Sequence, residues 1–72
     1  MTIYNRVDDL AQFDTPYGRV VRIQEVEFDG GMVLLRMRIR EGTRFTDLEL
    51  TAESATDIAD ALTSWARSQA AE

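Results

Sequence analysis

The stretch MVLLRMRIREGTRF, from Met32 to Phe45, carries the side chains best suited to recognising a partner. In it, large apolar residues alternate with Arg36, Arg38 and Arg40. Guanidinium groups present planar forks of hydrogen-bond donors that fit carboxylates and phosphates and stack on aromatic rings. The stretch therefore indicates either a surface for an anionic partner or the solvated side of a β-sheet, held by cross-strand ion pairs.

Other kinds of chemistry have few candidates in this chain. Cysteine and histidine are absent, which removes thiolate and imidazole metal ligands and the commonest general base. All eight basic residues are arginine, so serine and threonine have no lysine or histidine to activate them. The acidic pairs Asp8–Asp9 and Asp57–Asp60 match neither a calcium loop nor a catalytic cluster. We therefore expect no enzymatic activity, no cofactor and no metal site.

Length and composition predict one small domain, residues 1–72. A chain of this size buries only about 60% of the surface that its unfolded form exposes, so a partner that adds buried area would stabilise it. Its 44% hydrophobic and 29% charged residues are typical of a globular protein. No segment approaches the roughly 20 apolar residues of a membrane span, and the amino terminus lacks a secretory signal, so we expect a cytoplasmic protein. The net charge of −5 disfavours sequence-independent binding of nucleic acid.

The sequence predicts three β-strands, at residues 19–28, 32–40 and 43–50. The segments DGG (Asp29–Gly31) and EGT predict tight turns between them, because glycine readily adopts positive φ. In the second strand, apolar residues alternate with arginine. We align Leu35 with Leu48 and Met37 with Thr46, which places every large apolar side chain of this hairpin on one side.

The first predicted strand contains a break in its alternation. Val26 has the opposite phase to the apolar residues before it. One extra residue at Gln24 and Glu25, a β-bulge, would return Val26 to the apolar side. We therefore predict a bulge there, which would also place Arg36 between Glu25 and Asp47.

The segment before these strands, residues 1–14, fits either an extended lead-in or a short helix, and the sequence leaves both open. TPYG (Thr15–Gly18) then predicts a type I turn, with proline at the second position and glycine at the fourth.

Residues 52–69 predict a helix with an apolar stripe that includes Leu62 and Trp65. Thr51 can cap its first turn, or Ser54 can do so one turn later. Because an apolar stripe must be buried against another element, this helix is the expected cover for the sheet.

The predicted fold class is therefore α+β: a three-stranded antiparallel meander packed on one carboxy-terminal helix (βββα). In this arrangement Leu62 and Trp65 should contact Leu35, Met37 and Leu48.

The candidate binding site lies at one end of the sheet, where Arg22, Arg38 and Arg40 would surround an exposed Phe45. Carboxylates on both sides of Arg36 neutralise the centre of the face. An aromatic ring flanked by guanidinium groups can grip an acidic peptide or stack on a base.

This site predicts a small cytoplasmic protein-interaction module, an accessory or regulatory subunit of a larger assembly. Its partner would be another protein or a second copy in a homodimer, at this site or at an open sheet edge. The alternative is a nucleic-acid-binding βββα domain that reads through Arg22, Arg36, Arg38 and Arg40, since β-sheets are used in this way.

The run TPYGRVVRIQEVEFDGGMVLLRMRIREGTRFTDLEL, followed by an acidic helix ending in ALTSWA, resembles a family of very short bacterial proteins of unknown function. The resemblance covers Thr15 to Ala66, and RIREGTRFTDLEL is its most recognisable part. It implies no activity and no binding residues.

Overall fold

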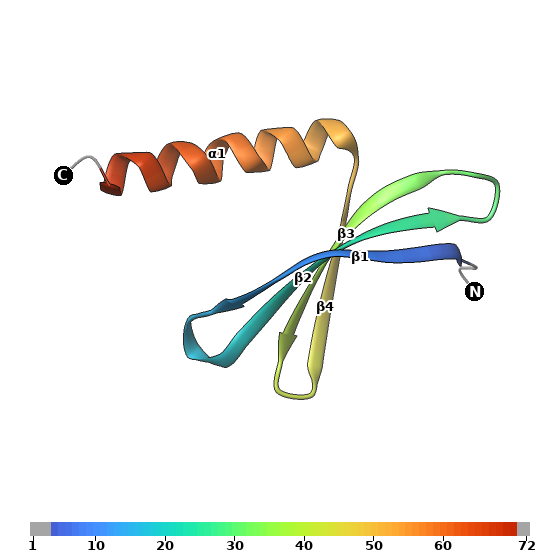
Figure 1. Ribbon diagram of the computed structural model, residues 1–72, viewed down its shortest axis with the longest axis horizontal. Helices are drawn as coiled ribbons and strands as arrows, with labels where there is room; N and C mark the ends of the chain where they lie inside the picture. Colours follow the sequence, from blue (N-terminus) through green and yellow to red (C-terminus); the bar gives the residue numbers. More distant parts are fainter. Residues whose placement is uncertain (1–3, 71–72) are drawn as a thin grey trace.

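The computed structural model describes residues 4–70. It is an α+β fold in which a four-stranded antiparallel sheet, in the order β1-β2-β3-β4, leads into one carboxy-terminal helix (Figure 1). The elements are β1 (Tyr4–Thr15), a short 3-10 turn η1 (Pro16–Gly18), β2 (Arg19–Phe28), β3 (Val33–Glu41), β4 (Arg44–Leu50) and α1 (Ala52–Ala70). The predicted strands and helix begin and end within one residue of β2, β3, β4 and α1, but the prediction of three strands is wrong.

The additional strand, β1, comes from the segment that fitted either an extended lead-in or a short helix. It is extended for 12 residues and pairs antiparallel with β2. Its register shifts twice, which leaves Asn5 and Leu10 as extra residues opposite β2. These bulges interrupt the period-two alternation that identifies a strand, which explains why the sequence pattern was ambiguous. Residues 1–3 of the predicted lead-in lie outside the described residues.

The bulge predicted at Gln24 and Glu25 is wrong. Residues of β2 and β3 pair without a register shift along the whole hairpin, so Val26 stays on the side opposite to Val21. Glu25 and Glu27 therefore remain among apolar neighbours. Arg6 of β1 forms ion pairs with both, with Nη1 2.9 Å from Glu25 and Nη2 3.3 Å from Glu27, and it also pairs with Asp8 of its own strand. Strand β1 thus supplies an ion-pair partner that the two glutamates share, and both side chains stay partly exposed, so β2 keeps them on this face without a bulge.

The pairing predicted for β3 and β4 is displaced by two residues. Leu35 lies opposite Leu50 and Met37 opposite Leu48. A displacement of two preserves the side on which each residue lies, so the sidedness is confirmed although the partners are wrong. Gly42, with φ 59°, is the first residue of the two-residue turn, the position at which a type II′ turn requires glycine.

The other two turns occur where the sequence predicted them. Gly30 and Gly31 have φ of 98° and 91°, and the amide of Phe28 donates to the carbonyl of Met32 at 2.8 Å. In the turn η1, however, Tyr17 has φ 66°. A type I turn has negative φ at both central residues, so the predicted turn type is wrong.

The sheet has two faces, which we name by their composition. The arginine face carries Arg22, Arg36, Arg38 and Arg40. The apolar face carries Val21, Ile23, Leu35, Met37, Ile39, Leu48 and Leu50. Burial does not follow this composition. Val26 is fully buried on the arginine face, beside Gln24 and Arg36, whereas among residues 4–70 the apolar face has only Leu50 buried to a comparable degree.

The helix α1 begins at a well-formed cap. Thr51 is the single residue between β4 and α1. The amide of Ser54 donates to Thr51 Oγ1 at 3.1 Å, and the amide of Thr51 donates to Ser54 Oγ at 2.9 Å. Of the two caps that the sequence allowed, Thr51 is the one observed, and Ser54 takes the part that glutamate has in a capping box.

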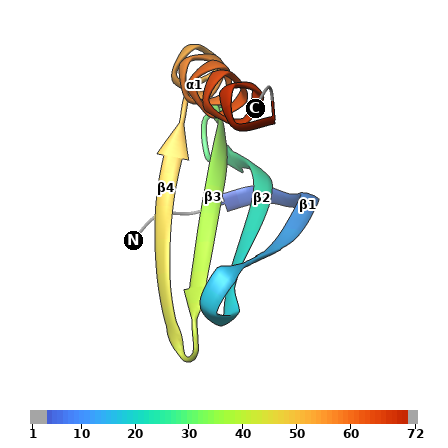
Figure 2. The same cartoon turned by 90° about the vertical axis from the view of Figure 1, so that its left-hand side faces the viewer.

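From this cap α1 runs away from the sheet and does not cross its apolar face (Figures 1 and 2). None of its described residues is buried, and Leu62 and Trp65 are 61% and 67% exposed. The predicted contacts of these two residues with the apolar face are therefore wrong. The link is the single residue Thr51, and its capping hydrogen bonds fix the direction in which α1 leaves β4. Within the described chain, no helix is long and apolar enough to cross a bilayer.

Candidate functional site

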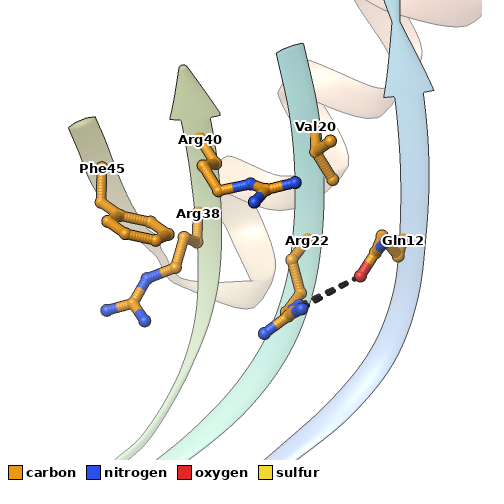
Figure 3. A pocket seen from close by; sticks show the side chains of 6 residues that line it. All are labelled: Gln12, Val20, Arg22, Arg38, Arg40 and Phe45. Carbon is orange, nitrogen blue, oxygen red and sulfur yellow. Dashed lines mark hydrogen bonds between the residues drawn. The ribbon is translucent and has the colours of Figure 1, made fainter. Parts of the chain in front are cut away.

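The structure brings all four predicted site residues together around one open hollow on the arginine face. The hollow has a volume of about 280 Å³, which includes open solvent, and is lined by Gln12, Val20, Arg22, Arg38, Arg40 and Phe45 (Figure 3). We call this group of residues the arginine corner. Four strands contribute to it: β1 provides Gln12, β2 and β3 provide two residues each, and β4 provides Phe45.

The strand register sets the positions within the arginine corner. Arg22 lies directly opposite Arg38 in the β2–β3 pair, and Arg40 lies opposite Phe45 in the β3–β4 pair. The predicted alignment of Met37 with Thr46 would place Phe45 opposite Arg38, an error that follows from the two-residue displacement. Diagonal neighbours in a sheet still come within reach of each other. The guanidinium carbon of Arg38 is 5.4 Å from the centre of the Phe45 ring, a cation–π distance.

Arg38 is already occupied by an intramolecular partner. Its Nε and Nη2 donate to the two carboxylate oxygens of Asp47 at 2.8 and 2.9 Å. These hydrogen bonds hold the pKa of Asp47 below its usual value and raise the pKa of Arg38. Arg38 therefore positions Phe45 and contributes little free charge to the corner.

Arg22 and Arg40 differ from Arg38 in this respect. Arg22 donates through Nε and Nη2 to Gln12 Oε1, at 3.3 and 3.1 Å, so its partner is a neutral amide (Figure 3). Neither Arg22 nor Arg40 has a carboxylate within 4 Å among residues 4–70. The arginine corner thus holds two guanidinium groups without a carboxylate partner in the described chain.

Arg36 lies outside the arginine corner, as predicted, but for a different reason. Its row contains Gln24 and Glu49 instead of the predicted Glu25 and Asp47. The Arg36 side chain is only 6% exposed, and its guanidinium carbon lies 4.6 Å from the centre of the Tyr4 ring. Burial under β1 makes Arg36 unavailable to a partner.

Sequence reasoning missed two residues of the corner. Val20 follows from the alternation of β2, since it lies on the same side as Arg22, and could have been included. Gln12 had no comparable signal, because the pairing of β1 with β2 was not foreseen.

Two other possible sites can be compared with the corner. Since β1 pairs with β2, the outer strands of the sheet are β1, which is bulged, and β4. The acidic residues give no candidate metal site in the described chain, because no group of three or more metal-ligating side chains comes together within residues 4–70.

Comparison with protein families matches residues 4–68, from the start of β1 to near the end of α1, with a family of unknown function, DUF6967. The chain belongs to this family. The resemblance to a family of unknown function is thereby confirmed, and both the arginine corner and α1 lie within the matched residues of DUF6967. No significant match was found among curated proteins or solved structures. Because membership of DUF6967 assigns no activity, function has to be inferred from geometry.

Proposed function

We propose that the protein is a noncatalytic interaction module, an accessory or regulatory subunit of a cytoplasmic assembly, that docks an acidic segment of a partner protein in the arginine corner. The observation that supports this proposal most is the environment of Arg22. It lies directly opposite Arg38 and has only the neutral Gln12 as a hydrogen-bond partner. Arg40, its diagonal neighbour in the β2–β3 pair, likewise has no carboxylate within 4 Å among residues 4–70, so a carboxylate from a partner would pair with two free guanidinium groups.

The size of the hollow favours a single side chain over a free metabolite. Its volume of about 280 Å³ includes open solvent. Sites for small molecules enclose about 300–1,000 Å³ and bury most of the ligand. Phe45, 56% exposed at the rim, offers an apolar surface for the methylene groups of a glutamate side chain. An Asp or Glu of a docked peptide matches this hollow in size and charge.

Charge also favours an acidic peptide over nucleic acid. Of the four arginines that a nucleic-acid reader would use, Arg36 is buried and Arg38 is paired with Asp47. Two guanidinium groups remain on a chain of net charge −5. Sequence-independent affinity for nucleic acid depends on releasing several counterions, which two arginines do not provide.

The test uses two charge-matched double variants of the full chain. Arg22→Gln with Arg40→Gln removes the free charges of the corner. Arg44→Gln with Arg67→Gln removes two charges that likewise have no ion pair within residues 4–70 but lie outside the corner. The probe is a fluorescent oligo-glutamate peptide, with oligo-glutamine as the blank, followed by anisotropy at several salt concentrations.

We expect the corner variant to lose about ten-fold in affinity for oligo-glutamate, because it loses charge-assisted hydrogen bonds, while the control changes less than two-fold. Equal losses in both variants would mean general electrostatic attraction and would contradict a defined site. Binding of a single-stranded oligonucleotide with a steep salt dependence would support the nucleic-acid alternative instead.

A further inference from the structure

The apolar face of the sheet is half-buried or exposed except at Leu50, and the apolar stripe of α1 is exposed from Ala59 onward. Leu48 on the sheet is 47% exposed, and Leu62 and Trp65 on the helix are 61% and 67% exposed. Contiguous apolar surface on a small protein marks a site of association. Here one chain carries two such surfaces, and they are of the complementary kinds that pack together: a sheet face and a helix stripe.

The solvent-accessible surface of the chain, compared with that of a compact monomer, indicates how much area an interface would have to bury. It is 5643 Å² for a mass of 8.2 kDa. A compact monomer of this mass exposes about 4,500 Å², so the chain has an excess of about 1,100 Å². One partner in a protein–protein interface of standard size buries about 800 Å². The radius of gyration of 14.3 Å is likewise larger than the roughly 11 Å expected for 72 residues.

The chain does not remove this excess by folding its own helix back (Figure 1). The capped, single-residue link at Thr51 sets the direction in which α1 leaves β4. Where the helix leaves the sheet there is an open hollow of about 490 Å³, lined by Glu25, Val33, Leu34, Leu35, Leu50, Thr51, Ala52 and Ala55. Contact of α1 with its own sheet is confined to this end, and every residue of α1 from Ala59 to Ala70 is exposed.

We propose that α1 of a second copy of this chain covers the apolar face, in a two-fold symmetric homodimer that exchanges its helices. The dimensions agree: the 19 residues of α1 span about 28 Å, and the nine residues of β3 span about 30 Å. A symmetric exchange buries both apolar surfaces of both copies with one kind of contact. The arginine corner lies on the opposite face of the sheet and stays open in this dimer.

The charges of α1 are consistent with a two-fold arrangement. Glu53 and Asp57 lie near its amino end and Arg67 lies in its last turn. Two copies of α1 that run antiparallel place the acidic end of one beside the basic end of the other. The pattern is thus self-complementary when the two-fold axis lies perpendicular to the helices.

The first test is the mass of the full chain in solution, measured by sedimentation over a range of concentrations. We expect twice 8.2 kDa for the wild type. Leu62→Glu and Leu48→Asp, one on each of the two surfaces, should each shift the dimer dissociation constant at least 100-fold. Thr63→Glu, on the exposed side of α1 away from the stripe, should leave it within a factor of three.

The second test identifies which surfaces meet and does not depend on the stability of those variants. Since the chain has no cysteine, Leu62→Cys and Met37→Cys chains can be mixed and oxidised. We expect a disulfide-linked species at twice the chain mass from this mixture, and at least ten-fold less from Thr63→Cys mixed with Met37→Cys. Trp65 emission should also move to shorter wavelength as the dimer forms.

Three results would overturn the proposal. A chain that stays monomeric at millimolar concentration, with the emission of an exposed tryptophan, does not use α1 in this way. A dimer that is unchanged by Leu62→Glu and Leu48→Asp associates through another surface, such as the edge of β4. A stoichiometric complex with a different protein that prevents the Leu62–Met37 cross-link would show that this other protein covers the apolar face.

Discussion

On the arginine face of the sheet Val26, Gln24 and Arg36 are exposed by 6% or less, whereas Leu48 on the apolar face is 47% exposed. The polar side of the sheet therefore contains the better-buried residues. The difference comes from the elements that adjoin each face. The arginine face is covered in part by the sheet's own first strand, and the apolar face is covered only near Leu50, where α1 begins.

The bulged strand β1 accounts for the burial on the arginine face. Its extra residues at Asn5 and Leu10 increase the local twist. Tyr4 then lies with its ring over the guanidinium of Arg36 and 5.2 Å, between ring centres, from Phe28. Burial in this small sheet is therefore set by which element reaches each face, and an apolar face that no element reaches is available for association.

Among the variants that test this difference between the two faces, Val26→Asp should lower the free energy of unfolding most. Val26 is fully buried beside Gln24 and Arg36, so the substitution removes a packed apolar side chain and places a carboxylate where water does not reach it. We expect a loss of about 4 kcal/mol in the free energy of unfolding, comparable to the whole stability of a domain this small. Urea titration followed by circular dichroism measures it.

Leu10→Asp is the matched control for Val26→Asp, because Leu10 is 58% exposed at a bulge of the same sheet. It should cost less than about 1 kcal/mol. Similar losses for the two variants would mean that the arginine face has no buried core.

Substitutions of Arg36 should give an intermediate effect that depends on the replacement. Its Nε has no hydrogen-bond partner within the described chain, and its carboxylate contacts with Asp47 and Glu49 are long, at 4.0 and 3.9 Å. Arg36→Ala leaves a cavity under Tyr4 and should cost about 2 kcal/mol. Arg36→Met fills the same space without burying a charge and should change stability by less than about 1 kcal/mol.

Thermal unfolding of the two Arg36 variants separates packing from charge. If Arg36→Met is as unstable as Arg36→Ala, the charge of Arg36 stabilises the arginine face, and burial there is not mainly a matter of packing.

Asp47→Asn should give the smallest effect, with a defined pH dependence. Arg38 lowers the pKa of Asp47 in the folded protein, so the pair adds stability above the unfolded pKa of about 3.9 and loses it as the pH falls through the lower folded pKa. Both side chains are about one-third exposed, so we expect a difference of about 0.5 kcal/mol at pH 7 that vanishes in acid. Urea midpoints of both proteins between pH 2 and pH 7 measure this, and a difference independent of pH would rule out the ion pair as its cause.

Local chemistry in the sequence was sufficient for several features of the fold. Glycines at DGG and EGT specify two hairpins because they adopt positive φ, and Thr51 specifies the start of α1 because its hydroxyl accepts a helix amide. Because residues of β3 alternate, its arginine and apolar side chains lie on opposite faces. A displacement of the pairing by two residues leaves each side chain on the same face. For this reason Arg22, Arg38, Arg40 and Phe45 meet in the arginine corner although the predicted pairing was displaced by two residues.

Contacts between distant segments decided the remaining features. The pairing of β1 with β2 depends on two bulges that hide its alternation, and it brings Arg6 to Glu25 and Glu27, which β2 keeps on the apolar face without a bulge. Hydrophobic periodicity shows which side of an element must be buried but not which element covers it. The sequence by itself therefore determined the hairpins, the helix and the two faces of the sheet. Only the tertiary structure decided that β1 covers part of the arginine face and that α1 leaves most of the apolar face open. The second outcome depends on the backbone geometry of the one-residue link at Thr51, which hydrophobic periodicity does not specify.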